Sequence, residues 1–288
     1  MSPKAQIGVI GGSGLYQLAG LKGAKTVKVK TPFGSPSGPI MLGSLDGVSC
    51  AFVPRHGPGH VLLPGEINVR ANIWALKSLG VDRVVAVAAV GSLKEELAPK
   101  HFVFPDQLVD RTLMSRPSTF FGDGIVAHTA FDQPFCEAQT DILYAKAQGL
   151  GLTTHRGGVY VCMEGPLFST KAESEFHRRN GWDVIGMTAV TEAKLAREAE
   201  LCYSLIALVT DYDCWKTGEE VSSSQVVATM NANVVNAQRL LEKSLAATAA
   251  RKRDCRCAHA LQGALVTAPK MMNPKTRAKL KLIIGKYI

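Results

Sequence analysis

The sequence predicts an α/β fold in which helices cover both faces of a sheet. Three observations predict it. Short, nearly continuous apolar runs recur along the chain, helix-like stretches lie between several of them, and 46% hydrophobic with 20% charged residues provide for a sizeable core. No internal repeat or low-complexity linker interrupts the 288 residues. We therefore expect one domain over residues 1–288, with a basic C-terminal tail at 266–288.

The expected strands are the apolar runs, because short runs of this kind between turn signals are typical of buried strands. In chain order they are IGVI (7–10), VSCAFV (48–53), VVAVAAV (84–90), VFPDQLV (103–109), VYVCM (159–163), DVIGM (183–187) and SLIALVT (204–210).

The expected helices are rich in helix formers, and several of them end at glycines. They cover 66–80, 140–151, 170–181, 191–201 and 223–250, the last being long and amphipathic with Ser223 or Ser224 as its N-cap. The Gly/Phe-rich stretch from 116 to 134 predicts an irregular functional or interface loop. Residues 274–288 place apolar side chains at helical spacing, which is compatible with a helix docked on this subunit or a neighbour, or with a partly loose tail.

The net charge of +9 is concentrated at the end of the chain. Residues 251–288 hold ten Lys and Arg and a single acid, Asp254, whereas the remaining 250 residues hold 23 basic and 23 acidic side chains. A neutral body with a basic tail argues against a broad nucleic-acid-binding face, so no nucleic-acid partner is expected.

Two further features bear on compartment and metals. The N-terminus lacks the pattern of a signal peptide, and the most apolar segment, Val84–Val90, is far too short to span a membrane, so no membrane partner is expected. The seven cysteines are scattered except for Cys255 and Cys257, which indicates a reducing, cytoplasmic compartment. Because no CxxC or HExxH spacing occurs, we predict no structural metal.

Two loops after strands have the composition of anion-binding sites. VIGGSGLY (9–16) combines glycines with the Ser13 hydroxyl, although a plain tight turn explains it equally well. VPRHGPGH (53–60) places Arg55 beside His56 in a rigid loop, which favours a phosphate or carboxylate clamp over a solvated loop.

Three other segments offer side chains for a flat ligand. VAAVGSL (87–93) has small residues that let a ligand lie against main chain, although tight packing explains them as well. MEGPLFSTKAESE (163–175) offers Phe168 for stacking. GMTAVTEA (186–193) offers the polarizable Met187 and the Thr188 hydroxyl just after a strand.

An apolar run ends at TDYDCW (210–215), which contains Asp211 and Asp213. Carboxylates two residues apart point to the same side of an extended chain. In one interpretation, one aspartate caps a helix or turn and the other is solvated. In the other, the carboxylates lie in a water-poor site that raises their pKa, so that they donate or share a proton with a ligand.

Seven ordered motifs together resemble the methylthioadenosine phosphorylase branch of the trimeric purine nucleoside phosphorylases. They are VIGGSGLY, VPRHGPGH, NVRANIWALKSLGV, VGSLKEELAP, MEGPLFSTKAE, DVIGMT and TDYDCW, and they cover roughly residues 5–265. The resemblance implies a single α/β domain with a central mixed, partly barrel-like sheet flanked by helices. It also implies a homotrimer or a dimer of trimers, and a pentosyltransferase of purine and methionine salvage that needs no metal or organic cofactor.

The implied reaction is reversible phosphorolysis of S-methyl-5′-thioadenosine to adenine and 5-methylthioribose 1-phosphate, with inorganic phosphate as co-substrate. The resemblance places phosphate at Ser13, Arg55, His56, Thr188 and the main-chain N–H of Ala89. It places ribose against Met187, the base near Phe168 and Ser169, and the 5′ group near Val226 and Val227. It implies Asp211 as the acid on purine N7 and Asp213 as the acceptor from the 6-amino group.

Two departures from the family pattern are visible. Ala88 stands where relatives carry a Thr or Ser hydroxyl for phosphate, and Ser223 stands where a valine usually lines the methylthio pocket. The first predicts weaker phosphate binding, and the second predicts that adenosine is also accepted. The CxC pair of Cys255 and Cys257 is sometimes oxidised in microbial relatives, but a reducing cytoplasm favours free thiols.

Three alternatives stay open at this point. A 6-oxopurine nucleoside or methylthioinosine phosphorylase would be expected to carry Asn in place of one aspartate, and a nucleosidase would use water instead of phosphate. A non-catalytic nucleoside-binding protein is favoured only by Ala88.

Overall fold

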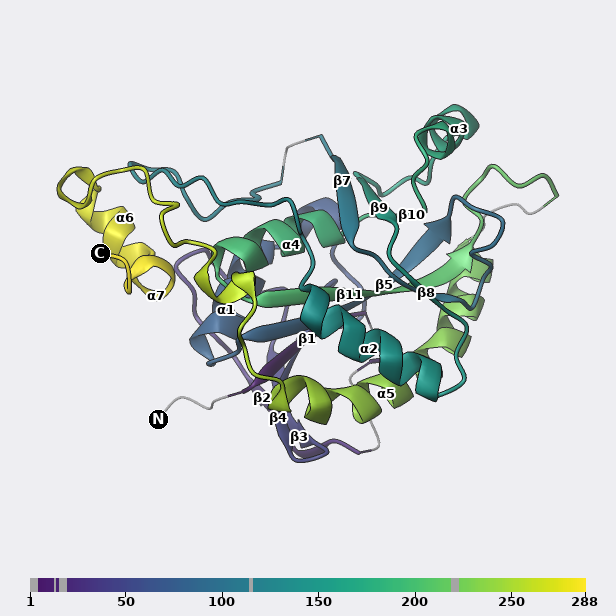
Figure 1. Ribbon diagram of the computed structural model, residues 1–288, viewed down its shortest axis with the longest axis horizontal. Coiled ribbons are helices and arrows are strands. Elements are labelled where there is room, and N and C mark those ends of the chain that lie inside the picture. The colour runs from purple at the N-terminus through teal and green to yellow at the C-terminus, as the bar shows by residue number, and fades with distance from the viewer. Residues whose placement is uncertain (1–4, 13, 16–19, 114–115, 219–222) are drawn as a thin grey trace.

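The computed structural model describes residues 5–12, 14–15, 20–113, 116–218 and 223–288. They form an α/β domain built on a mixed sheet with helices on both faces (Figure 1). The strands are β1 (Ile7–Gly11), β2 (Lys22–Val27), β3 (Ile40–Leu45), β4 (Val48–Pro54), β5 (Arg83–Ser92), β6 (Phe102–Phe104), β7 (Gln107–Arg111), β8 (Thr154–Arg156), β9 (Val159–Met163), β10 (Val184–Gly186) and β11 (Cys202–Asp211). The α/β prediction is confirmed.

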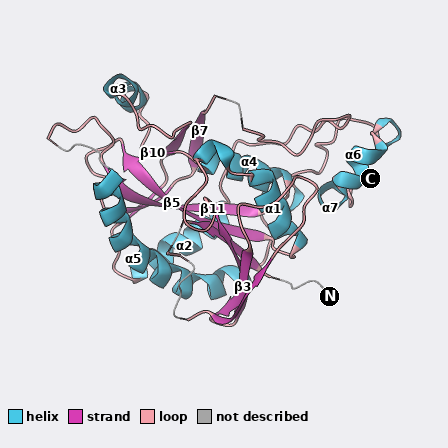
Figure 2. Ribbon diagram, turned by 180° about the vertical axis from the view of Figure 1, so that it is seen from behind, coloured by secondary structure: helices cyan, strands magenta, loops and turns pink. Residues whose placement is uncertain are grey.

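The helices are α1 (Val69–Ser78), α2 (Glu137–Gly149), α3 (Lys171–Arg179), α4 (Ala189–Glu198), α5 (Ser223–Ala250), α6 (Pro274–Lys279) and α7 (Lys281–Ile284). Short 3₁₀ turns are η1 (Pro64–Glu66), η2 (Arg256–His259) and η3 (Pro269–Met271). Each of the predicted helices is present. Figure 2 shows the same arrangement from behind, with α1 and α4 on one side of β5 and β11, and α5 on the other.

The sheet forks at β5. One path runs β2-β3-β4-β1-β5-β10-β9-β7, while β11 pairs with the other edge of β5 and leads on to β6 and β8. Strands β1, β4, β5 and β11 are mutually parallel, whereas β10 runs antiparallel to β5. The carboxyl ends of β4, β5 and β11 therefore meet at one edge of the sheet.

Side chains of β5 alternate between two cores, as expected for a strand buried on both faces. Ala86, Ala88 and Val90 belong to the core under α1 and α4, and Val85 and Val87 belong to the core under α2 and α5. This confirms the interpretation of its unbroken apolar run as a fully covered strand.

The prediction of one strand over 103–109 is wrong. The segment forms β6 and β7, which pair with different neighbours, β6 with β8 and β11 and β7 with β9. Pro105 lies between them, and because proline lacks an N–H it interrupts a ladder. Strands β2, β3 and β8 carried no clear apolar signal. Strand β2 is an edge strand rich in lysine and almost fully exposed, which is how sheet edges avoid pairing with other chains.

The loop from 116 to 134 is irregular as predicted, with isolated bridges between Gly122 and Ile125 and between Ala127 and Leu265. The tail docks on this chain. Leu280, Ile283 and Ile284 are buried in the core under α1 and α4. Figure 1 shows α6 and α7 at the end of the molecule opposite α3. No helix in the described part of the chain combines the length and apolar character needed to cross a membrane.

Candidate active site

A gap in the pairing of β5 lies at the centre of the site. On one edge of β5, β1 pairs as far as Ala86 and β10 begins only at Gly91. Between them, every second residue of β5 directs its main-chain groups to this edge, where no strand of the described elements pairs with them. The other residues face β11. The carbonyl of Val87 points into the gap, where it accepts a hydrogen bond of 2.8 Å from Arg55 Nη1. Because main-chain groups of residues two apart point to the same edge of a strand, the N–H of Ala89 also points into the gap.

Arg55 follows β4 and is held in a buried ion pair. Its Nε donates to Glu192 Oε1 at 2.5 Å and its Nη2 donates to Oε2 at 3.1 Å, and both side chains are almost fully buried. Tyr203 donates to the same carboxylate at 2.8 Å. Burial alone would lower the pKa of Arg55, but Glu192 raises it above its ordinary value, so the guanidinium stays charged. These bonds and the one to Val87 use three of its five N–H groups and leave two for a ligand among the described contacts.

His56, next in the chain, is a neutral imidazole at pH 7. Burial, helped by the adjacent charge of Arg55, lowers its pKa to about 4. Nδ1 lies 2.9 Å from the carbonyl oxygen of Leu62, so Nδ1 carries the proton and Nε2 is an acceptor. An acceptor here suits an anion that still carries an O–H, such as hydrogen phosphate, whereas the positive charge comes from Arg55.

Thr188 lies beside the gap as the N-cap of α4. It is buried, its side chain makes no capping bond, and its N–H donates to the Tyr160 hydroxyl at 3.3 Å. Strand β10, which pairs with Gly91 and Ser92 of β5, leads directly into Thr188. Because the first N–H groups of a helix attract anions, the start of α4 adds to the positive character of the gap.

Asp211 ends β11 and is fixed by two local bonds. Its Oδ1 accepts the N–H of Asp213 at 2.8 Å, and its Oδ2 accepts the Thr210 hydroxyl at 2.7 Å. Burial raises the pKa of Asp211 above its ordinary value, against the lowering effect of these two donors. A buried carboxyl of raised pKa, held in one orientation, is suited to transfer a proton to a ligand.

Asp213 does not continue the strand. Its φ of 52° places it in a left-handed turn, so the expectation that both aspartates project from one extended chain is wrong in its geometry. The turn nevertheless brings them together, because the Asp213 N–H bonds Asp211. Oδ2 of Asp213 is buried and has no hydrogen-bond partner among the described residues. Burial also raises the pKa of Asp213, in spite of the nearby hydroxyls of Ser174 and Ser169.

The residues around the aspartates anchor the turn. Tyr212 donates to the carbonyl of Glu95 at 3.2 Å, and Trp215 Nε1 donates to the carbonyl of Ser92 at 2.7 Å. The Arg178 guanidinium lies 3.8 Å from the centroid of the Trp215 ring. The turn is therefore fastened to the end of β5 and to α3.

Gly91 supports both carboxyls. A Cβ added there would lie 2.9 Å from Asp211 Oδ1 and 3.4 Å from Asp213 Cβ. Val87 and Gly91 are four residues apart, which is about 13 Å along an extended strand. The cationic gap and the paired acids thus stand at two points of one strand, with room between them for a small elongated ligand.

Substituting Gly91 with alanine is expected to lower turnover by about 100-fold, because the new methyl group displaces Asp211 and a misplacement of about 1 Å can have that effect. Steady-state kinetics of Gly91→Ala measure it. Gly149→Ala is the matched control, because a Cβ at Gly149 meets nothing within 4 Å. Equal kinetics of the two variants would contradict the placement of the aspartates against β5.

The segment predicted to hold a flat base lies near the acids. Ser169 is buried, and its carbonyl accepts the Cys214 thiol at 3.2 Å, which ties this segment to the turn of Asp213. Phe168 is 44% exposed. Met187 is half-buried, and its carbonyl accepts Arg116 Nη1 at 2.5 Å. The carboxylate of Glu164 pairs with Arg116.

The remaining predicted residues either have no contact with these two groups among the described contacts or lie outside the described residues. Val226 is half-buried and Val227 is exposed on α5. Ser13 and the side chain of Ser223 lie outside the described residues. The structure therefore brings Arg55, His56, Ala89 and Thr188 around the gap. It places Ser169 near the two carboxyls of Asp211 and Asp213.

Residue patterns missed two positioning groups. Glu192 holds Arg55, and Tyr160 accepts N–H groups from Thr188 and Ala189 at 3.3 and 3.5 Å. Glu192 stands four residues after the N-cap of α4, so it lies one turn along the same helix face. That spacing was available in the sequence, but its partner Arg55 is 137 residues away.

The chain is similar to known proteins over nearly its whole length. The model of the phosphorylase superfamily matches residues 6–246. A protein of Geobacter sulfurreducens named S-methyl-5′-thioadenosine phosphorylase is 51% identical over 98% of this chain and 99% of its own.

Solved structures agree. The crystal structure of a methylthioadenosine phosphorylase from an antarctic soil metagenomic library has a TM-score of 0.93 at 46% identity, covering 97% of this chain and 99% of its own. A methylthioadenosine phosphorylase of Schistosoma mansoni in complex with adenine has a TM-score of 0.83 at 35% identity, covering 98% of each chain.

Proposed function

The chain belongs to the phosphorylase superfamily, and we propose that it catalyses phosphorolysis of S-methyl-5′-thioadenosine to adenine and 5-methylthioribose 1-phosphate. The observation that carries this assignment is the pairing gap of β5, with a buried cation at one end and two buried carboxyls of raised pKa at the other. Its relatives' names agree with this reaction. The enzyme is a nucleoside phosphorylase, a pentosyltransferase with inorganic phosphate as co-substrate.

Phosphate binds at the gap. Arg55 supplies the charge, while the Thr188 hydroxyl and the Ala89 N–H supply donors. Neutral His56 accepts a hydrogen bond from the remaining P–OH through Nε2. Ser13 adds a hydroxyl from the first loop. A phosphate held this way attacks C1′ of the sugar and stabilises the positive charge that develops there.

Adenine leaves at the opposite end. Cleavage of the N-glycosidic bond places negative charge on the purine, and protonation at N7 neutralises it. Asp211 donates this proton, and its raised pKa favours the protonated form that this role needs. The base stacks near Phe168 and Ser169, and the ribose rests against Met187.

Asp213 recognises the 6-amino group. Its buried Oδ2 has no partner among the described residues, so a bound amino group supplies the missing donor. A 6-oxopurine would instead place its carbonyl oxygen against this carboxylate. The enzyme is therefore expected to prefer adenine nucleosides to hypoxanthine nucleosides. This preference disfavours the alternative of a 6-oxopurine nucleoside or methylthioinosine phosphorylase.

The pocket for the 5′ group of the nucleoside is more polar than one lined by valines alone. We propose Val226 and Val227 of α5 as its apolar part, with Ser223 where relatives carry valine. Adenosine is therefore a second substrate.

A phosphorolysis panel tests the function. Methylthioadenosine, adenosine, inosine and guanosine are each incubated with and without phosphate, and free base and sugar phosphate are quantified. We expect adenine and 5-methylthioribose 1-phosphate only when phosphate is present, with little release from inosine and guanosine. Base release without phosphate would identify a nucleosidase. Ligand-dependent melting without turnover would identify a binding protein, and preferred turnover of inosine would identify a 6-oxopurine enzyme.

Substituting Ala88 with threonine is expected to lower the phosphate KM by about tenfold. The side chain of Ala88 lies in the core under α1 and α4, and a hydrogen bond to a charged group contributes about 1.5 kcal/mol. Ala88→Val, which has the same shape without the hydroxyl, is the control. If both variants change the KM equally, packing rather than a missing hydroxyl explains the effect.

We also propose a homotrimer or a dimer of trimers, as the family resemblance implies. Leu113 and Leu167 are exposed by 79% and 81%, and such apolar side chains suit a subunit contact. An odd number of cysteines supports a reducing, cytoplasmic compartment.

A further inference from the structure

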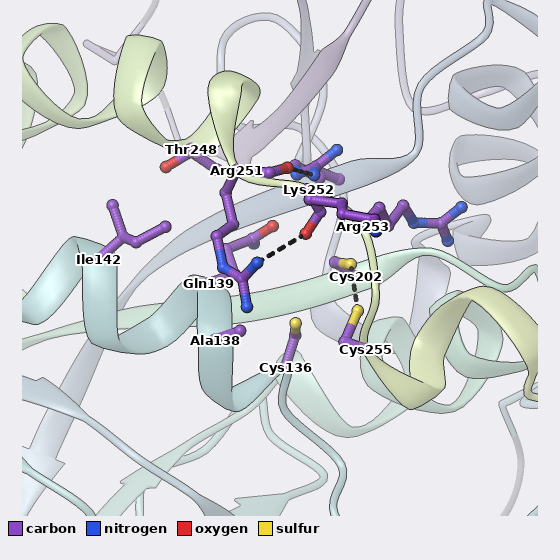
Figure 3. A pocket seen from close by; sticks show the side chains of 11 residues that line it. Cys136, Ala138, Gln139, Ile142, Cys202, Thr248, Arg251, Lys252, Arg253 and Cys255 are labelled. Atoms are coloured by element: carbon purple, nitrogen blue, oxygen red, sulfur yellow. Dashed lines mark hydrogen bonds between the residues drawn. The ribbon is translucent and has the colours of Figure 1, made fainter.

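Four cysteines that are scattered in the sequence meet at one point, away from the site described above. Cys136 precedes α2, Cys202 begins β11, and Cys255 and Cys257 lie at the start of η2. Their four Sγ atoms all lie within 4.8 Å of one another. Figure 3 shows the thiols of Cys136, Cys202 and Cys255 turned toward one another from three different segments.

The spacing of these atoms is close to that of a tetrahedral thiolate site. Zinc–sulfur bonds of about 2.3 Å place tetrahedral sulfur atoms about 3.8 Å apart. Sγ of Cys202 and Sγ of Cys255 are 3.3 Å apart, and the other pairs fall within 4.8 Å, so shifts of about 1 Å or less complete the geometry. Cys136, Cys202 and Cys257 are buried, whereas Cys255 is half-buried and gives an ion access.

The charges around the cluster suit an anionic complex. Zinc bound by four thiolates carries a net charge of −2. The cavity beside the thiols is lined by Arg83, Arg251, Lys252 and Arg253, and no carboxylate is among its lining residues in the described chain. Basic side chains would repel a bare cation but stabilise the complex of the cation with four thiolates.

Arg253 provides a separate indication. Its Nε is buried and has no hydrogen-bond partner among the described residues, although its Nη2 donates to the carbonyl of Glu200. A thiol is a weak acceptor for such a donor, whereas a metal-bound thiolate is a strong one, and outer groups of this kind are typical of metal sites.

We propose that Cys136, Cys202, Cys255 and Cys257 bind one zinc ion, which fastens the segment after α5 to α2 and β11. Binding releases four protons, one from each thiol, and forms four Zn–S bonds without any change of oxidation state. The chemistry therefore needs no oxidant, in contrast to a disulfide between the same residues. The CxC pair alone predicted no metal, because the other two ligands lie 53 and more residues earlier in the chain.

The test is the metal content of the full-length protein, purified in a reducing buffer and dialysed against metal-free buffer. We expect about one zinc per chain by elemental mass spectrometry, and a fall to under about one tenth in Cys255→Ala. Cys50→Ala is the control, because Cys50 is equally a buried thiol but lies in a different core. It is expected to keep the metal.

A second measurement does not depend on how the variants fold. Wild-type protein is stripped with a strong chelator and reloaded with Co²⁺, whose absorption spectrum distinguishes tetrahedral thiolate coordination from other ligands. We expect that spectrum, a lower Tm after stripping and recovery on reloading with zinc. Substituting Arg253 with methionine is expected to weaken zinc affinity about 10- to 100-fold.

Several results would overturn the proposal. They are a wild-type protein that retains no zinc, a chain in which these cysteines are found as disulfides, and a Cys255→Ala variant that keeps the metal of the wild type. Cobalt bound without sulfur ligands would do so as well.

Discussion

Replacing Asp211 with asparagine is expected to lower kcat for methylthioadenosine by about 10²- to 10⁴-fold, the usual contribution of a positioned acid. The amide keeps the shape of the side chain and can still accept from the Asp213 N–H, but it has no proton to give to N7. Substrate binding should change much less than kcat, because the lost interaction belongs to the transition state.

The pH profile makes the assignment specific. Burial raises the pKa of Asp211, and the acid must be protonated to act, so wild-type kcat should fall as the pH rises through that pKa. The Asp211→Asn variant should lose this alkaline limb. Asp213→Asn is the comparison: its amide can donate to a 6-oxo group, so it should improve the relative use of inosine. An Asp211→Asn variant with wild-type kcat would remove Asp211 from the mechanism.

Replacing Glu192 with glutamine is expected to lower the free energy of unfolding by about 3–5 kcal/mol, because it leaves the Arg55 charge buried without its counterion. The phosphate KM should rise in the same variant, since the neutral amide no longer fixes both Nε and Nη2 of Arg55. Denaturant unfolding and phosphate saturation kinetics measure the two effects.

Glu198→Gln is the matched control on the same helix. Burial raises the pKa of Glu198 to about 7, and its carboxylate accepts from Phe120 N–H and the Thr119 hydroxyl, with no arginine partner among the described residues. Its replacement should affect stability far less and leave the phosphate KM unchanged. The double variant Arg55→Gln with Glu192→Gln should regain stability relative to Glu192→Gln while binding phosphate poorly. Equal effects of the two glutamate substitutions would contradict a specific ion pair.

Local pattern was sufficient for much of the fold. Apolar runs predicted the buried strands, since a strand covered on both faces has only apolar positions, as the alternation of β5 between two cores confirms. The same runs explain why Arg55 and Asp211 share an edge: each follows or ends a parallel strand. Exposed strands such as β2 were not predicted, because the charged residues of an edge strand resemble those of a loop.

Which residues meet across long separations was decided by tertiary structure. The sequence of TDYDCW is compatible with an extended chain, but the structure turns Asp213 left-handed so that its N–H reaches Asp211. Glu192 looks like an ordinary helix residue until β4 brings Arg55 beside it. The four thiols also could not be grouped from the sequence. The sequence shows only a CxC pair, whereas the fold brings two distant cysteines to it. Local preferences act over a few residues, whereas burial of a charge or a thiol depends on packing against segments that the chain reaches only when folded.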